Sequence, residues 1–410
     1  MVNFKEEIAA LKAKGLQRKM RFIASANDRY ITLDGKKVLN LCSNNYLGLA
    51  NDRRLEKAAI SAIKKFGIAS GASRLVSGST VLHRELEKKL ARFKKQEAAL
   101  VYTSGYSANL GIISSIVGRG DIVFSDRLNH ASIIDGIILS RAELVRYPHK
   151  DIEALDKLLN RPPAPAAAGS SRVPRQKKLI ITDSVFSMDG DIAPIPELLR
   201  LAEKYDCLLM IDEAHATGVL GKNGRGALEH FGIKANERII QMGTLSKALG
   251  GLGGFVCGSG ELIDYLVNRS RSFIFSTSLP AALCASALKV IEIIEKDGAL
   301  RQRLKENANF LRRGLKDMGF DTLDSKDTAI IPVLTKEPKL TMEFSRRLFT
   351  EGIFVQGIRP PTVSEGLCRL RITVMATHTK KDLEFTLAKF KELGTDTNSL
   401  NLTGGISVCP

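Results

Sequence analysis

Residues 239–257, IIQMGTLSKALGGLGGFVC, place a single lysine between two apolar runs. Small and hydroxyl-bearing residues precede Lys247, four glycines follow it within Gly250–Gly254, and no other charge lies between Arg238 and Glu261. A lysine in apolar, glycine-rich surroundings loses hydration, so the pKa of its amine tends to fall and the amine can attack a carbonyl compound. The stretch is equally compatible with a lysine that reaches solvent from the end of a core strand.

Length and composition restrict the class of protein. A chain of 410 residues exceeds one simple core and predicts two or more subdomains. Its 44% apolar content is typical of a globular protein, and no apolar run approaches the roughly 20 residues that span a bilayer. The N-terminus carries acids early and lacks a secretory signal, and the six cysteines are scattered without a Cys-x-x-Cys pair. We therefore expect a cytoplasmic protein, with no membrane partner.

The formal net charge of +17 allows several partners. Nucleic-acid binding draws on clustered basic residues, but here they alternate with acids, as in residues 84–92, a pattern typical of a solvated helix face. No zinc-finger spacing and no aromatic-rich sheet motif is present. A positive field that attracts an anionic small molecule is the preferred interpretation, although a plain solvated surface explains the charge equally well.

Short apolar runs alternate with helical patterns from about residue 49 to residue 285. Strands are expected at residues 98–102, 122–124, 144–146, 179–182 and 208–211 and in the two runs that flank Lys247. Because these runs are continuous rather than alternating, both faces of each strand should be buried. The pattern predicts an α/β fold with a mostly parallel central sheet between helices.

The two ends of the chain show sequence patterns that differ from the alternating pattern of this central part. An amphipathic helix is expected from residue 1 to about residue 25, and Asp34-Gly35 predicts a hairpin between residues 30–33 and 38–41. A long helix over 281–318 and strands at 330–334 and 370–374 around a further helix predict a smaller α+β subdomain. The predicted divisions are an N-terminal helix and hairpin (1–48), a large domain (49–285), a small C-terminal domain (286–393) and a frayed tail (394–410). The Pro- and Ala-rich segment 161–171 is expected to be a surface loop.

Polar residues follow several expected strands, where open parallel sheets bind their ligands. Ser104, Gly105 and Tyr106 open a helix, and the free amides of a helix N-terminus bind phosphate. His130 follows residues 122–124, where an imidazole can stack on a flat ligand, move protons or simply cap a helix. For this histidine taken alone, the structural role of a helix cap is the preferred interpretation.

Asp212 stands at the end of a buried strand, where a carboxylate is costly unless it meets a cation. His215 follows three residues later and faces the same direction. Metal ligation and structural capping are alternatives, but no third metal ligand has a suitable spacing, and no metal is expected. An aldehyde-binding lysine, an acid for a pyridinium nitrogen and a phosphate anchor are what pyridoxal 5'-phosphate (PLP) requires. Lys247, Asp212, His215 and residues 104–106 together predict a PLP site.

The motifs resemble those of the α-oxoamine synthase family of fold-type I PLP enzymes, from about residue 18 to residue 392. They are SNNYLGL (43–49), GASRLVSG (71–78), NHAS (129–132), SMDGD (187–191), DEAHATG (212–218), GTLSK (243–247) and FSTSLP (275–280). The resemblance implies that Lys247 holds the cofactor and removes the substrate α-proton, that Asp212 pairs with the pyridinium nitrogen and His215 with the ring hydroxyl, and that His130 stacks over the ring.

The same resemblance assigns the remaining site residues. Ser187 and Thr244 would add hydrogen bonds, residues 104–106 would hold the phosphate, and Thr277 would reach the phosphate of the neighbouring subunit in a homodimer. Arg371 would bind the amino-acid carboxylate, with Arg359 nearby, and Asn44 and Ser77 would complete the substrate site. Arginine suits a carboxylate because its fork binds both oxygens. An N-terminal arginine also contributes in the family, and Arg18 and Arg21 both remain candidates. Asp183 stands where many family members carry glutamate, so its role is open.

Within the family, DEAHATGVLG (212–221) and RPPTV (359–363) most resemble the members that condense L-alanine with a pimeloyl thioester, carried by coenzyme A or acyl-carrier protein, in biotin biosynthesis. That decarboxylative condensation is the expected activity. The alternative within the family is condensation of glycine with acetyl-CoA. An alternative of another class is a basic nucleic-acid-binding protein that keeps the fold, but no nucleic-acid partner is expected.

Overall fold

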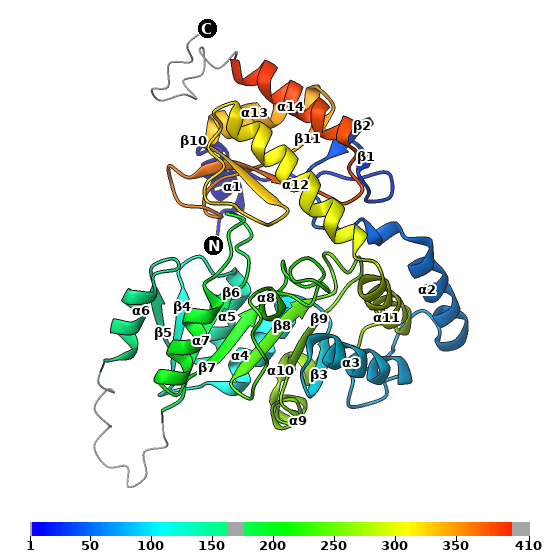
Figure 1. Cartoon of the computed structure of the whole chain (residues 1–410), viewed down its shortest axis with the longest axis vertical. Helices are drawn as coiled ribbons and strands as arrows, with labels where there is room; N and C mark the ends of the chain where they lie inside the picture. Colours follow the sequence, from blue (N-terminus) through cyan, green and yellow to red (C-terminus); the bar gives the residue numbers. More distant parts are fainter. Residues whose placement is uncertain (1, 162–175, 396–410) are drawn as a thin grey trace. The chain divides into compact units, whose positions relative to one another are not determined.

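In the computed structural model, which describes residues 2–161 and 176–395, seven strands form one sheet in the order β3-β9-β8-β7-β6-β4-β5 (Figure 1). The strands are β3 (Ala98–Tyr102), β4 (Ile122–Asp126), β5 (Glu143–Tyr147), β6 (Lys178–Asp183), β7 (Leu208–Asp212), β8 (Ile239–Thr244) and β9 (Gly254–Gly258). Neighbours from β8 to β5 are parallel, and β9 is antiparallel to both β8 and β3. All seven predicted strands and the mostly parallel sheet are confirmed.

Both faces of this sheet are buried, which explains why its strands are continuously apolar. On β6, Leu179 and Ile181 face one core and Ile180 faces another. The first core contains α4 (Gly105–Ile116), α5 (Ala131–Ser140), α9 (Gly260–Arg269) and α10 (Arg271–Ile274). The second contains α6 (Ile152–Leu159), α7 (Ile195–Lys204) and α8 (Ala227–His230). The carboxyl ends of the strands thus project from a sheet that is fixed from two sides.

Three further helices complete this unit. They are α2 (Arg53–Phe66), α3 (Val81–Lys94) and α11 (Ala281–Lys296). Asp52 caps α2 by accepting from the Arg54 N–H, and α11 packs against both α2 and α3. The unit comprises residues 52–187 and 192–301, apart from the undescribed segment 162–175.

The second unit combines both ends of the described chain, residues 2–51, 188–191 and 302–395. The predicted hairpin is present as β1 (Tyr30–Leu33) and β2 (Lys36–Asn40), and β11 (Ile353–Phe354) pairs parallel to β2. A second sheet joins β10 (Ile330–Lys336), β13 (Cys368–Thr373) and β12 (Gln356–Ile358), all antiparallel. One core packs these strands against α12 (Ala299–Asp317), α13 (Pro338–Thr350) and α14 (Lys380–Thr395). A 3-10 turn, η1 (Leu49–Asn51), ends the N-terminal segment.

Three predicted boundaries are wrong. The N-terminal helix α1 covers only Phe4–Ala13, because Gly15 takes a left-handed conformation and the Leu16 N–H closes back on the Leu11 carbonyl. The predicted long helix is two helices, α11 and α12, separated at Asp297, whose carboxylate accepts from the Ala299 N–H.

The predicted tail begins too early, because Gly394 and Thr395 still belong to α14. The rest of that tail, and the predicted loop from residue 162 onward, lie outside the described residues. Among the described helices, none has the length and apolar character needed to cross a membrane.

Candidate active site

Five parallel strands end at one edge of the large sheet. At or just after the end of each strand lies either a predicted site residue or Asp183, whose role the sequence left open. Asp183 and Asp212 are the last residues of β6 and β7 and lie in register with each other. Lys247 follows β8, His130 follows β4, and Ser104 follows β3. The edge therefore brings together residues that are far apart in the sequence, as expected for a ligand site of an open parallel sheet.

Lys247 lies in a tight turn between β8 and β9. Its Nζ is 2.8 Å from Nε2 of His215, on the loop after β7. The Leu245 N–H donates to the Gly253 carbonyl, which closes the turn. Gly253 has a φ of +131°, and a Cβ there would come within 2.8 Å of a Leu279 methyl group. The glycines therefore let the chain turn closely beside Lys247, as predicted.

Asp212 is buried and both of its carboxylate oxygens accept hydrogen bonds. Oδ1 accepts from the Ala214 N–H at 2.9 Å, and Oδ2 accepts from Nδ2 of Asn109 at 2.8 Å. The next N–H along the chain, of Glu213, donates to the Met242 carbonyl at the end of β8. These contacts fix the acid against the strand that leads to Lys247.

His130 and Asp183 are joined through the backbone. The His130 N–H donates to Oδ2 of Asp183 at 2.8 Å, and the Asp183 N–H donates to Oδ1 of Asn129. Burial, together with the neighbouring Asp212 charge, raises the pKa of Asp183 well above its ordinary value. Burial, opposed in part by Asp212, lowers the pKa of His130. The Asp183 carboxyl group thus holds the His130 backbone.

The expected phosphate anchor is the N-terminus of α4. Ser104 caps this helix, its Oγ accepting from the Ser107 N–H at 3.0 Å. The first N–H groups of a helix have no partner within the helix and are available to an anion. Gly105 approaches β8 so closely that a Cβ would lie 3.1 Å from Cε of Met242. Thr244 closes the same corner by donating to the Gly253 carbonyl at 2.8 Å.

Tyr106 projects from the first turn of α4. It is exposed, and its hydroxyl donates to Asp135 on α5, a bond that raises the pKa of the phenol. Its backbone can contribute to the phosphate anchor, while its side chain ties α4 to α5. Ser187 lies half-buried beyond β6.

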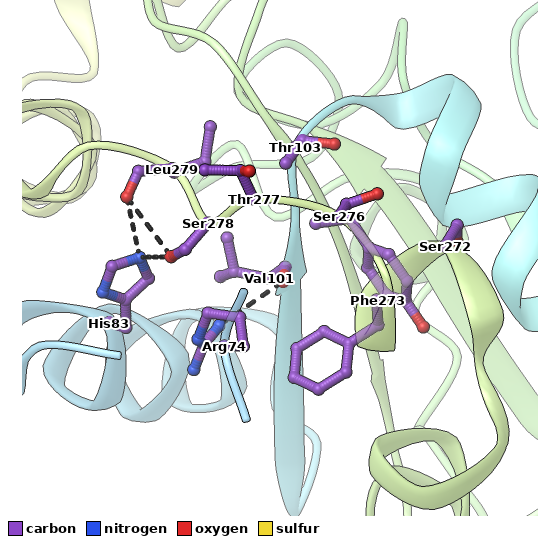
Figure 2. A pocket seen from close by; sticks show the side chains of 11 residues that line it. Arg74, His83, Val101, Thr103, Ser272, Phe273, Ser276, Thr277, Ser278 and Leu279 are labelled. Atoms are coloured by element: carbon purple, nitrogen blue, oxygen red, sulfur yellow. Dashed lines mark hydrogen bonds between the residues drawn. The ribbon is translucent and has the colours of Figure 1, made fainter. Parts of the chain in front are cut away.

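Thr277 is exposed on the segment that carries the FSTSLP motif, beside a small pocket (Figure 2). That segment is paired with the GASRLVSG motif: Thr277 forms a β-bridge with Ser73, and the Ser278 N–H donates to the Ala72 carbonyl. Nε2 of the buried His83 lies 2.8 Å from the Ser278 hydroxyl, and burial lowers the pKa of His83 to about 4. These contacts hold the two motifs together, and Thr277 is exposed on the paired segments. Ser77 is exposed on the same loop.

The predicted carboxylate clamp lies in the other unit. Arg371 is buried and its Nη2 donates to Oδ1 of Asn44 at 3.2 Å. Arg359 is also buried, but it donates to the Gly15 and Gln17 carbonyls at 3.0 and 2.9 Å. Arg371 and Asn44 are therefore brought together, whereas Arg359 holds the segment that follows α1.

The two N-terminal arginines differ in their contacts. Arg21 pairs with Asp34 at 2.7 Å and lies over the ring of Phe349, 4.0 Å from its centroid. Arg18 reaches Thr362 through one contact of 3.3 Å, at an exposed position. Arg21 therefore holds the hairpin, whereas Arg18 is exposed.

Comparison with known proteins places the chain in a family. It belongs to the aminotransferase class I and II family, whose model matches residues 36–390. A high-resolution structure of SPT with PLP shares the fold with a TM-score of 0.88 at 33% identity, over 96% of this chain and 97% of that one. The fold is that of the fold-type I PLP enzymes, as predicted.

More specific relatives carry one name. The 8-amino-7-oxononanoate synthase of Geobacter sulfurreducens is 52% identical over 390 residues, which are 95% of this chain and 97% of the relative. A crystal structure of 8-amino-7-oxononanoate synthase from Francisella tularensis has a TM-score of 0.74 at 28% identity and covers 88% of this chain and 99% of that one. The resemblance inferred from the motifs is confirmed.

The residues at the sheet edge fit PLP by their chemistry. Lys247 offers an amine, Asp212 a buried carboxylate fixed by two donors, and α4 a helix N-terminus at which Gly105 permits close approach. Asn109 and Ser132 contact Asp212 and His130 at this edge, and sequence reasoning assigned neither of them a role. A lone amide in the apolar helix α4 was the available signal, because a buried amide must find partners.

Proposed function

We propose that this chain is a PLP-dependent acyltransferase that condenses L-alanine with a pimeloyl thioester, releasing the thiol and carbon dioxide and giving 8-amino-7-oxononanoate for biotin synthesis. The contact of Lys247 with His215 at the ends of adjacent parallel strands supports the cofactor chemistry. The 52% identity over 95% of the chain to a relative of that name supports the substrates. Free cysteines at all five described cysteine positions suit work in a reducing cytoplasm.

Each residue at the sheet edge would have a separate role in cofactor binding or proton transfer. When bound, PLP takes up the electron pair left when a bond to the amino-acid α-carbon breaks. Lys247 would hold the aldehyde carbon of PLP, and its Nζ would take the α-proton of alanine. Asp212 would pair with the ring nitrogen and His215 with the ring hydroxyl. His130, whose pKa is lowered by burial, would lie on the ring as a neutral imidazole.

Further cofactor contacts would come from Ser187, Thr244 and the N-terminus of α4. Thr244 is well placed to support the phosphate anchor, because a Cβ on Gly105 would lie 3.5 Å from its side chain. Ser104, Gly105 and Tyr106 would supply hydroxyl and backbone N–H donors to the phosphate. Ser77 would line the acyl-substrate path from its exposed loop.

Arg371 would bind the alanine carboxylate, with Asn44 orienting its guanidinium. Replacing Arg371 with Lys removes the two-pronged contact, so we expect the KM for alanine to rise about 10- to 100-fold with a smaller change in kcat. Arg18→Ala should raise this KM about 3- to 10-fold, whereas Arg21→Ala should leave it unchanged and lower thermal stability. Steady-state kinetics with alanine as the varied substrate measures these values.

Arg359→Lys is the matched control for Arg371→Lys. Its guanidinium binds the Gly15 and Gln17 carbonyls, so the substitution should lower thermal stability and leave the KM for alanine within about 3-fold. A larger KM effect at Arg359 than at Arg371 would reverse the two assignments.

A homodimer would complete the cofactor site. The exposed Thr277 hydroxyl, held by the pairing of the two motifs, would donate to the phosphate bound in the partner subunit. Sedimentation velocity should give twice the mass of one chain, and Thr277→Val should weaken PLP binding about 3- to 10-fold without changing that mass. A monomer with full activity would contradict this arrangement.

One substrate panel tests the function as a whole. The purified protein, reconstituted with PLP, is mixed with alanine, glycine or serine and with pimeloyl-CoA, pimeloyl-acyl-carrier protein or acetyl-CoA, and the products are identified by mass spectrometry. We expect 8-amino-7-oxononanoate from alanine and a pimeloyl thioester. Product only from glycine and acetyl-CoA would assign a glycine C-acetyltransferase. A protein that binds DNA with strong salt dependence but takes up no PLP would overturn the enzyme assignment.

A further inference from the structure

Asn109 is a buried amide in a helix that is otherwise apolar on its inner side. It lies in the second turn of α4 with 1% of its surface exposed, among the isoleucines that pack against the sheet. Burying an amide costs free energy unless its hydrogen bonds are replaced. An apolar residue would fill this position at a lower cost in free energy, so the presence of an amide here must be explained by its hydrogen bonds.

Both amide hydrogens of Asn109 are used at the sheet edge. Nδ2 donates to Oδ2 of Asp212 at 2.8 Å and to the Ser132 hydroxyl at 2.8 Å. Oδ1 is buried and has no hydrogen-bond partner among the described residues. The reversed amide would turn this oxygen toward the Asp212 carboxylate, which is unfavourable. Asn109 is thus held entirely as a donor.

The close packing of α4 on α5 makes this bridge possible. Gly136 of α5 lies so near that a Cβ there would be 3.1 Å from the Asn109 carbonyl and 3.0 Å from a methyl group of Ile113. A larger residue would push the helices apart and carry Ser132 away from Asn109. The glycine therefore brings the start of α5 within hydrogen-bond reach of α4.

Ser132 continues the bridge to the His130 ring. The Ser132 N–H donates to Nδ1 of His130 at 3.3 Å, so Nδ1 is an acceptor and carries no hydrogen. The Ser132 hydroxyl lies 2.7 Å from the same nitrogen and therefore donates to it, while its oxygen accepts from Asn109. The ring hydrogen is left on Nε2.

We propose that Asn109 is a positioning residue that links Asp212 to His130 through Ser132, so that one amide sets both the acid that meets the PLP ring nitrogen and the imidazole that lies on the ring. An amide donates without releasing its protons at neutral pH, so the link orients these groups and does not carry a proton between them. The proposal rests on the proposed function, because it gives Asp212 and His130 their cofactor roles.

Two variants break the link at different points. Asn109→Leu removes both donors with little change in size, and Ser132→Ala removes only the arm to His130. Ser114→Ala is the matched control, because its hydroxyl binds only the Leu110 carbonyl of the same helix. Asn109→Leu should weaken PLP binding about 10- to 100-fold and Ser132→Ala about 3- to 10-fold, with no change in the control. Equilibrium titration of the apoprotein with PLP measures these dissociation constants.

A second measurement separates positioning from general destabilisation. In ¹⁵N-histidine-labelled apoprotein, the His130 nitrogens of the wild type should show one neutral tautomer with hydrogen on Nε2. Both variants should move them toward a tautomer mixture. The charged and titratable groups that face His130 and Asp212 are Asp183, Lys247 and Asp135, and all three are retained in both variants.

The outcomes decide between the possibilities. A shifted tautomer in Ser132→Ala supports the link even if Asn109→Leu fails to fold, and an unchanged tautomer together with unchanged PLP affinity overturns it. If the wild type takes up no PLP, the proposed function fails, while the tautomer measurement still decides whether Asn109 and Ser132 orient His130.

Discussion

Two lysines of the large unit each contact a residue of the loop that follows β7, yet their surroundings differ. Lys94, at the end of α3, is wholly buried, and its Nζ binds the Glu213 carboxylate, the Arg225 carbonyl and, at 3.4 Å, the Thr217 hydroxyl. Lys247 is half-buried in a glycine-rich turn and meets the imidazole of His215. Glu213 and His215, two residues apart in the chain, therefore belong to two separate lysine regions.

The comparison shows that the two lysines differ in the chemistry of their partners as well as in burial. The partners of Lys94 are a carboxylate and two further oxygen acceptors, which hold its side chain in place. The imidazole beside Lys247 also has a nitrogen lone pair and can exchange a hydrogen bond with a neutral amine. The first region fixes the loop that carries His215, and the second provides the amine that would hold PLP.

Lys247→Ala should give the largest functional effect. Loss of the amine removes both the attachment of PLP and the base for the α-proton, so kcat/KM should fall at least about 10³-fold. The fold should persist, because the turn around residue 247 is closed by backbone bonds between Leu245 and Gly253. Turnover of alanine and pimeloyl thioester and thermal unfolding of the apoprotein are the measurements.

Lys222→Ala, at an exposed position, is the control for this change and should keep normal turnover. Normal turnover in Lys247→Ala would show that the reactive amine lies elsewhere.

Lys94→Met should give the opposite pattern. It leaves the Glu213 carboxylate buried without its cation, which costs about 3–5 kcal/mol of unfolding free energy. Urea unfolding of the apoprotein at pH 7 measures this loss. Molecules that remain folded should still take up PLP, because Lys247 is unchanged.

The double variant Lys94→Met/Glu213→Leu tests whether the loss comes from the unpaired charge. Removing both charges should restore most of the stability that Lys94→Met loses. A double variant as unstable as the single one would instead indicate that Lys94 acts mainly through its bond to the Arg225 carbonyl.

The positions of Lys247, Asp212 and His215 at the ends of neighbouring strands were predictable because their sequence signals are local. Lys247 is isolated from other charges, Asp212 and His215 are three residues apart, and each follows an apolar run that forms a strand. Parallel strands then bring their ends together without further information. The seven strands of the large sheet were predictable for the same reason.

The contacts that support these residues could not be predicted from local sequence signals. Lys94 and Glu213 are 119 residues apart, and Asn109 and Asp212 are 103 apart, so only the folded chain shows that they meet. Arg359 is a predicted substrate-binding residue, and its contacts with the Gly15 and Gln17 carbonyls, 344 and 342 residues away, appear only in the folded chain. The break at Asp297 was missed because apolar spacing continues on both sides of it, while a local cap ends the helix.

Asp183 offers a smaller and finer test, since this third buried acid lies in register with Asp212. Burial raises its pKa above the unfolded value of about 3.9, so between these two pH values the folded protein binds more protons than the unfolded chain. Wild-type stability from this residue is therefore present in acid and lost as the pH rises through the folded pKa. Asp183→Asn, which keeps an oxygen for the His130 N–H, lacks this loss.

The difference in unfolding free energy between Asp183→Asn and the wild type should therefore move in favour of the variant from pH 5 to pH 8, as measured by urea unfolding of the apoproteins. Because asparagine keeps an oxygen that can accept from the His130 N–H, turnover by the variant should stay within about 3-fold of the wild type. Asp212→Asn, the matched change at the neighbouring strand end, should lower turnover at least about 100-fold, since its charge is the one that would meet the ring nitrogen. Equal losses from both substitutions would show that Asp183 is ionised and shares the role of Asp212.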